Sequence, residues 1–100
     1  MYTIHITETA NADLTAIFNY IAEDSEDRAS NYLGKLGQEI LELQDFPNMG
    51  SCGRYEELKR LGIRMLLYDD YLILYTVSEK NEKVNIVRVV HGTVDYRRLF

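Results

Sequence analysis

The chain has 100 residues, with 16 acidic and 11 basic side chains and a formal net charge of −5. A chain of this length holds one hydrophobic core, so a single domain over residues 1–100 is expected and a two-domain enzyme is excluded. Apolar residues make up 46% and charged residues 27%, which excludes a disordered chain. No apolar run reaches the roughly 18 residues that cross a bilayer, and the first residues do not resemble a signal peptide. With one cysteine and two histidines, we expect a cytoplasmic domain without a membrane segment, disulfide, metal ion or cofactor.

The charge is divided unevenly between the two halves of the chain. Residues 1–50 carry nine acidic and two basic side chains, a net charge of −7, whereas residues 51–100 carry seven acidic and nine basic ones, a net charge of +2. The overall acidity disfavours a nucleic-acid-binding surface, because phosphate binding requires surplus lysine and arginine. The basic half is therefore where we expect a partner to bind.

The first residues predict a strand followed by a helix. Apolar and polar residues alternate over residues 2–6, a pattern typical of a strand. From residue 8 to about residue 23 the apolar residues recur at helical spacing, and Thr7 or Thr9 can serve as the N-cap.

A second helix follows after a short polar break. Ser25 can cap it and Pro47 stops it, and the tight connection predicts an antiparallel helical hairpin. Gly34 and Gly37 lie inside this helix, where each costs about 1 kcal/mol relative to alanine. We therefore expect another part of the backbone to approach the helix closely at these positions.

The second half of the chain predicts strands over residues 62–68, 71–77 and 84–91. The short separations between these runs suit consecutive antiparallel hairpins. Both faces of the run 71–77 are apolar, so we expect this strand to be central and covered on each side. Residues 95–100 are too few for more than one turn of helix. The expected order is β-α-α-β-β-β, an α+β fold with a helical hairpin packed on one face of a small, mainly antiparallel sheet.

Three polar residues within the apolar strands are candidates for chemistry. The chain has no nucleotide-binding glycine loop, nucleophile elbow or Cys–His pair, so the candidates that remain are Arg64, Arg88 and His91. An arginine within a strand either pairs with an acid or faces a groove, and for Arg88 the expected acid lies on a neighbouring strand or is Asp95. His91 fits either a hydrogen-bonded structural residue or an acid–base group. Arg88 and His91 are three residues apart, so their side chains leave opposite faces unless the strand bends.

Several tyrosines gather in the same half of the chain. With arginines they can stack nucleic-acid bases, although tyrosine is also an ordinary strand residue. The four tyrosines of this group are Tyr68, Tyr71, Tyr75 and Tyr96.

Five segments stand out as a set: ADLTAIFNYIAED, LELQDFPNMG, YEELKRLGIR, YLILYTV and VNIVRVVHGTVD. Together they resemble the RelE/ParE family of toxins from bacterial type II toxin–antitoxin systems. The resemblance extends over essentially the whole chain. Its most specific parts are Leu58 with Gly62-Ile63-Arg64, Tyr71-x-Ile73-x-Tyr75, and His91-Gly92-x-x-Asp95.

The resemblance implies one of two activities on the same fold. RelE-like members cleave mRNA on the ribosome, whereas ParE-like members poison DNA gyrase and have no known catalytic residue. Leu72 stands where the ribonuclease pattern has an arginine after the tyrosine that matches Tyr71. The ending HG-x-x-D is closer to the ParE-like members, although Val94 replaces the arginine that is common before Asp95. We therefore favour a ParE-like gyrase inhibitor that is not an enzyme.

Two alternatives follow from the same resemblance. In an mRNA endoribonuclease, Arg64 would hold phosphate, His91 would transfer the proton, and Tyr96 would stack or donate. In an inactivated module, the chain would only bind an antitoxin and help to repress the operon.

The resemblance also implies a cognate antitoxin, whose tail is often acidic in this family. We expect Arg60, Arg64 and Arg88 to form one basic docking surface for it. Further residues expected at the target- or antitoxin-binding surface are Tyr71, Tyr75, His91 and Asp95. Since the hairpin covers one face of the sheet, the antitoxin is expected to cover the other face.

Overall fold

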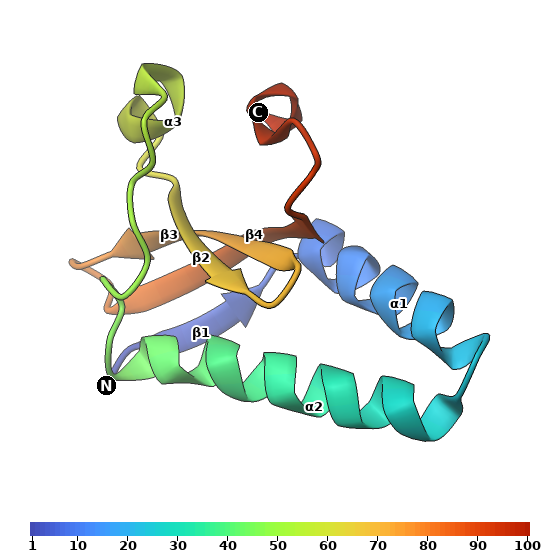
Figure 1. The fold of residues 1–100 in the computed structure, drawn as a ribbon. Helices are drawn as coiled ribbons and strands as arrows, with labels where there is room; N and C mark the ends of the chain where they lie inside the picture. Colours follow the sequence, from blue (N-terminus) through green and yellow to red (C-terminus); the bar gives the residue numbers. More distant parts are fainter.

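The computed structural model describes residues 1–100 as a four-stranded sheet with a helical hairpin on one face (Figure 1). The long elements are β1 (Thr3–Ile6), α1 (Glu8–Ala22), α2 (Glu26–Leu41), β2 (Arg64–Tyr68), β3 (Tyr71–Ser78) and β4 (Lys83–His91). Three short helical turns are η1 (Glu42–Gln44), α3 (Glu56–Arg60) and η2 (Tyr96–Leu99). The long elements follow the predicted order, and the α+β fold is confirmed. None of the helices combines the length and the apolar character needed to cross a membrane.

Each helix of the hairpin begins with a side-chain cap. Thr7 Oγ1 accepts a hydrogen bond from the Ala10 N–H at 3.1 Å, so Thr7 and not Thr9 is the N-cap of α1. Ser25 Oγ accepts from the N–H three residues further on, at 3.2 Å, and caps α2 as predicted. Thr7 Oγ1 also donates to the Ile86 carbonyl at 2.9 Å, so the residue that starts α1 also ties it to β4.

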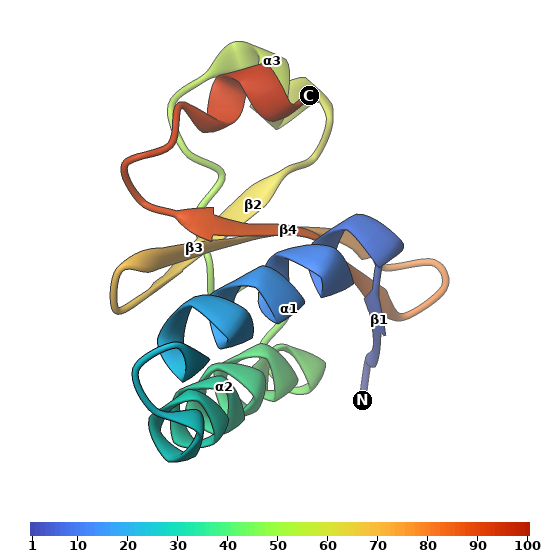
Figure 2. The same ribbon diagram turned by 90° about the vertical axis from the view of Figure 1, so that its right-hand side faces the viewer.

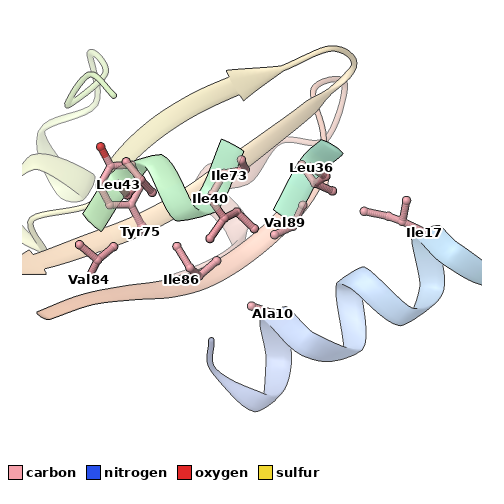
Figure 3. Close-up of a cluster of buried hydrophobic side chains, with 10 residues drawn as sticks. All are labelled: Ala10, Ile17, Leu36, Ile40, Leu43, Ile73, Tyr75, Val84, Ile86 and Val89. Atoms are coloured by element: carbon pink, nitrogen blue, oxygen red, sulfur yellow. The ribbon is translucent and has the colours of Figure 1, made fainter. Parts of the chain in front are cut away.

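The sheet has the strand order β1-β4-β3-β2, with β1 parallel to β4 and the other pairs antiparallel. One face of the central strands packs on the hairpin in a core of ten buried residues (Figure 3). Ile73 and Tyr75 of β3 meet Leu36 and Ile40 of α2 in this core, whereas Leu74 faces the opposite side. The predicted alternation of β3 between two apolar faces is confirmed.

The face of the sheet away from the hairpin is covered by α3 and η2 (Figures 1 and 2). Beneath these turns lies a second buried cluster, which contains Leu58, Ile63, Leu74 and Val90. The prediction left this face for a partner to cover, but two short segments of the same chain cover part of it, while Leu67 on the same face stays 64% exposed.

The end of α3 gives a physical meaning to one of the sequence motifs. Gly62 has a φ of +72°, its N–H donates to the Lys59 carbonyl at 3.0 Å, and the Ile63 N–H donates to the Leu58 carbonyl at 2.9 Å. These bonds form a Schellman motif, which is completed by the packing of Leu58 and Ile63 in one cluster. The segment from Leu58 to Ile63 is thus a helix stop that also anchors α3 to the sheet.

The glycines of α2 are not explained by contacts within the chain. A methyl group built on Gly34 or Gly37 finds no heavy atom within 4 Å, so the expected close backbone approach is wrong. Such an approach exists instead at Gly50, where an added Cβ would lie 2.5 Å from the Met65 carbonyl oxygen and 2.8 Å from Tyr75 Oη.

Candidate functional site

Tyr75, one of the expected surface residues, is fully buried and holds the loop that follows α2. Its hydroxyl donates to the Pro47 carbonyl at 2.9 Å and accepts from the Gly50 N–H at 2.9 Å. The two bonds satisfy the Pro47 carbonyl and the Gly50 N–H, which lie in a turn and have no partner on a neighbouring strand. In this structure Tyr75 therefore organises the loop and does not reach the surface.

Arg64 stands opposite Tyr75 in the pairing of β2 with β3 and binds the same loop. One terminal nitrogen, Nη2, donates to the carbonyls of Asn48 and Gly50, and the other, Nη1, lies 3.3 Å from Cys52 Sγ. None of the ion pairs involves Arg64, and its Nε is buried without a hydrogen-bond partner. The positive charge of Arg64 is therefore held by loop carbonyls and is not neutralised by a carboxylate.

Tyr71 and His91 lie together at the other end of β3. They are direct partners in the pairing of β3 with β4, and their ring centroids are 5.6 Å apart at an interplanar angle of 79°. Tyr71 also contacts Tyr32 of α2, with ring centroids 6.0 Å apart, and the Tyr32 hydroxyl donates to Asp69 Oδ2 at 2.8 Å. Burial raises the pKa of both tyrosines, and for Tyr32 the hydrogen bond to Asp69 raises it further.

The ring nitrogens of His91 have different roles. Nδ1 accepts a hydrogen bond from the Thr93 N–H at 3.2 Å and lies 2.8 Å from Thr93 Oγ1. When Nδ1 accepts this bond, the ring proton of the neutral imidazole sits on Nε2, which is then a hydrogen-bond donor.

The three residues that a ribonuclease would need do not converge. Arg64 pairs with Tyr75 and His91 with Tyr71, and these two positions on β3 are four residues apart, about 13 Å along a strand. Tyr96 lies on the opposite face of the sheet, where its ring contacts Tyr55 at 5.7 Å.

Arg88 is bound within the fold. Its Nε and Nη2 donate to the two carboxylate oxygens of Asp13 on α1, at 2.8 and 3.1 Å. Asp13 also accepts from the Val89 N–H at 2.9 Å, at the edge of β4 beyond the end of β1. The hydrogen bonds to Asp13 raise the pKa of Arg88. The acid predicted on a neighbouring strand or at Asp95 is thus Asp13, because α1 takes over from β1 along this edge.

A surface that the sequence did not reveal is formed where α3 meets η2. Tyr55 packs against Tyr96, and the guanidinium carbons of Arg54 and Arg97 lie 5.6 and 4.5 Å from the centre of the Tyr55 ring. Asp95 pairs with Arg97 at 3.4 Å, and its hydrogen bond raises the pKa of Arg97. A neighbouring cleft of about 330 Å³ is lined by residues of both turns.

We call this region the arginine surface. It carries five of the 11 lysines and arginines: Arg54, Lys59, Arg60, Arg97 and Arg98. Of the residues predicted from the sequence it contains Arg60, Asp95 and Tyr96, but neither Arg64 nor Arg88. The basic residues at 54–60 and 97–98 were visible in the sequence, but about 40 positions separate them and only the fold brings them together.

Comparison with solved structures identifies the fold. The chromosomal ParDE toxin–antitoxin system of P. aeruginosa matches with a TM-score of 0.74 and 21% identity, over 91% of this chain and 96% of that one. The RelBE2 toxin–antitoxin complex of Mycobacterium tuberculosis matches at 0.67 and 25% identity, over 90% and 96%. The isolated RelE toxin of E. coli matches at 0.66 and 12% identity, over the whole of both chains. The fold is therefore that of the RelE and ParE toxins.

The family follows from the sequence comparison. The family model for the ParE toxin of the type II toxin–antitoxin system parDE matches residues 4–96. The chain belongs to this family and is a type II toxin. A comparison with curated protein sequences gives no match.

Proposed function

We propose that the chain inhibits growth by poisoning DNA gyrase in the cytoplasm and that a cognate antitoxin neutralises it. The ParE family assignment over residues 4–96 supports this proposal, as does the similarity to the ParDE system of P. aeruginosa. Leu72, which stands where a ribonuclease would have an arginine, points in the same direction.

The observation that carries the choice against mRNA cleavage is the separation of Arg64, His91 and Tyr96. Transfer of a ribose proton and stabilisation of a developing phosphorane charge require their donors within a few ångströms of one phosphate. Here two of the residues lie about 13 Å apart along β3 and the third lies on the other face.

The arginine surface is the proposed contact region for an acidic partner. Arg60 makes no ion pair within the chain, and the side chain of Arg98 is 86% exposed although it pairs with Asp95 at 3.5 Å. We therefore propose that these two arginines bind the acidic segment of the antitoxin or an acidic patch on the target. This replaces the patch of Arg60, Arg64 and Arg88, because the last two already have partners inside the fold. Binding through this surface should weaken as the salt concentration rises.

Expression of the chain without a partner tests the proposal. Loss of plasmid supercoiling before loss of protein synthesis is the expected result, and purified protein should inhibit gyrase supercoiling of a relaxed plasmid. A double variant, Arg60→Ala with Arg98→Ala, should reduce this inhibition at least tenfold. Lys80→Ala removes the same kind of charge from the exposed turn between β3 and β4 and should have no effect.

Two other results would overturn the proposal. If translation fails first, mRNA is cleaved in a translation extract, and His91→Ala abolishes the cleavage, the chain is a ribonuclease. If neither process is affected but the chain binds the product of an adjacent short reading frame, it is a binding module without toxicity.

A further inference from the structure

A row of aromatic side chains crosses the sheet at the end where β2 turns into β3. Tyr68 of β2 pairs with Tyr71 of β3, and Tyr71 pairs with His91 of β4. Tyr32 of α2 lies against this row, with its ring centroid 6.2 Å from that of Tyr68 and 6.0 Å from that of Tyr71. Burial raises the pKa of Tyr71, and the nearby Tyr20 of α1 raises it further. We call these five side chains the tyrosine patch.

The tyrosine patch is open to solvent. The turn between α1 and α2 extends beyond the end of the sheet (Figure 1), so the hairpin does not close over the patch. Tyr20 is 73% exposed, His91 is exposed, and the other three rings are half-buried. Of the four tyrosine hydroxyls, only that of Tyr32 is hydrogen-bonded within the chain. Open aromatic rings gathered in this way are typical of a surface that binds a partner.

Carboxylates without a cationic partner lie beside the rings. Asp69 and Asp70 form the turn between β2 and β3, and both are exposed. Neither takes part in any of the five ion pairs of the chain. The Tyr32 hydroxyl donates to Asp69 Oδ2 at 2.8 Å, which fixes this carboxylate next to the aromatic rings. Asp70 makes no such bond, so its carboxylate is free to bind a cation.

The chain itself shows which cation fits such a site. On the arginine surface, the guanidinium carbon of Arg97 lies 4.5 Å from the centre of the Tyr55 ring, and the same guanidinium pairs with Asp95 at 3.4 Å. A guanidinium is planar, so it can stack on an aromatic ring while its edge binds a carboxylate. The tyrosine patch offers the same two groups, but no arginine of the chain stacks on its rings. The site therefore fits an arginine from another protein.

The charge around the patch determines which partner can bind there. Glu23 and Asp24 line a cleft of about 400 Å³ together with Tyr20, and the one basic residue of this cleft, Arg28, already pairs with Asp24. Carboxylates repel the phosphates of nucleic acids and any acidic peptide. The segment proposed for the antitoxin is acidic, so gyrase is the favoured source of the arginine.

We propose that the tyrosine patch binds an arginine side chain on the surface of gyrase. The guanidinium stacks on the open rings of Tyr20 and Tyr71 and pairs with Asp70, because Asp69 is already held by Tyr32. This inference rests on the proposed gyrase target. It assigns that target a contact opposite in charge to the arginine surface, and two contacts of opposite charge fix the orientation of the bound partner.

Removal of the most open ring and of the free carboxylate gives the test. The purified chain is titrated against gyrase, with binding to the immobilised enzyme and supercoiling of a relaxed plasmid as the two readouts. The double variant Tyr20→Leu with Asp70→Asn should bind and inhibit more weakly by about tenfold or more. Its circular dichroism spectrum should match that of wild type, because both side chains are exposed.

Two control variants separate the proposed contact from other effects. Tyr20→Phe keeps the ring and removes only the hydroxyl, so its affinity should stay within about twofold of wild type. Glu79→Gln removes one negative charge from the exposed turn between β3 and β4 and should also stay within about twofold. Because the arginine pairs with a carboxylate, the difference between wild type and the double variant should shrink as the salt concentration rises.

Each remaining outcome overturns the inference in a distinguishable way. If wild type and the double variant inhibit gyrase equally, the patch is not a gyrase contact, although the proposed function stands. If wild type neither binds nor inhibits gyrase, both proposals fail. If the double variant inhibits gyrase like wild type but no longer binds the product of the adjacent short reading frame, the arginine belongs to the antitoxin. If wild type alone self-associates and the double variant does not, the arginine belongs to a second copy of the chain.

Discussion

The bond network of Tyr75 allows a sharp test of how the loop after α2 is held. Tyr75→Phe removes one hydroxyl and leaves the Pro47 carbonyl and the Gly50 N–H without the partners that each has at 2.9 Å. A hydrogen bond contributes about 0.5–1.5 kcal/mol net, and a buried group left unsatisfied costs about 1–3 kcal/mol. Because Tyr75 is fully buried, water cannot readily replace its hydroxyl, and we expect a loss of about 2 kcal/mol. For a domain of this size the corresponding fall in Tm is about 8–16 °C.

Urea denaturation followed by circular dichroism measures this loss as a lower transition midpoint at an unchanged slope. Tyr71→Phe is the matched control, because Tyr71 lies on the same face of β3 and its hydroxyl makes no hydrogen bond in the structure. The control should stay within about 0.5 kcal/mol of wild type. If Tyr75→Phe lowers the free energy of unfolding by less than about 0.5 kcal/mol, the conclusion that this hydroxyl holds the loop is refuted.

Three further substitutions test other parts of the fold. Asp13→Ala should lower the unfolding free energy by about 1–3 kcal/mol, because the Asp13–Arg88 pair is only partly exposed. The loss should exceed that of Arg88→Ala, because Asp13 also accepts a hydrogen bond from the Val89 N–H. Equal losses in urea denaturation would contradict the view that Asp13 binds both Arg88 and the backbone. Because burial raises the pKa of Tyr32 in the folded chain, its contribution to stability is complete below pH of about 10 and is lost above it, as the unfolded tyrosine ionises first. The Tm of Tyr32→Phe should therefore fall less steeply than that of wild type above about pH 10, and parallel curves would disprove the linkage. Gly62→Ala should cost about 1–2 kcal/mol, since its φ of +72° strains any residue with a Cβ, and a neutral result in the same denaturation assay would argue against the helix stop.

Most of the secondary structure followed from local patterns. The alternation before Glu8, the helical spacing on both sides of Ser25 and the three apolar runs each place residues on one face of an element, and that face must be buried. Caps are equally local, so Thr7 and Ser25 were within reach of the sequence. By contrast, α3 has only five residues, too few to show a periodicity, although its glycine stop was present.

Residues that are far apart in the sequence were assigned less well. Arg88 finds Asp13 75 positions away, and a choice among 16 acidic residues cannot be made from strand spacing. Arg64 was expected at a docking surface, but its nearest acceptors are carbonyls of a loop whose path depends on Tyr75. In both cases the partner is chosen by the packing of another element.

By itself the sequence determined the fold class, the helical hairpin and the two-sided central strand, because these depend on apolar patterns that repeat within each element. It also determined membership in a toxin family, because the family model matches the sequence over residues 4–96. The tertiary structure alone decided where the charge and the open apolar surface lie. It gathers arginines from α3 and η2 on one side of the sheet. On the other side it leaves an apolar groove between β1 and α2, with Gly34 and Gly37 in its wall. The reason is physical: a surface consists of side chains that neighbouring elements leave uncovered, and that remainder is known only after every element has packed.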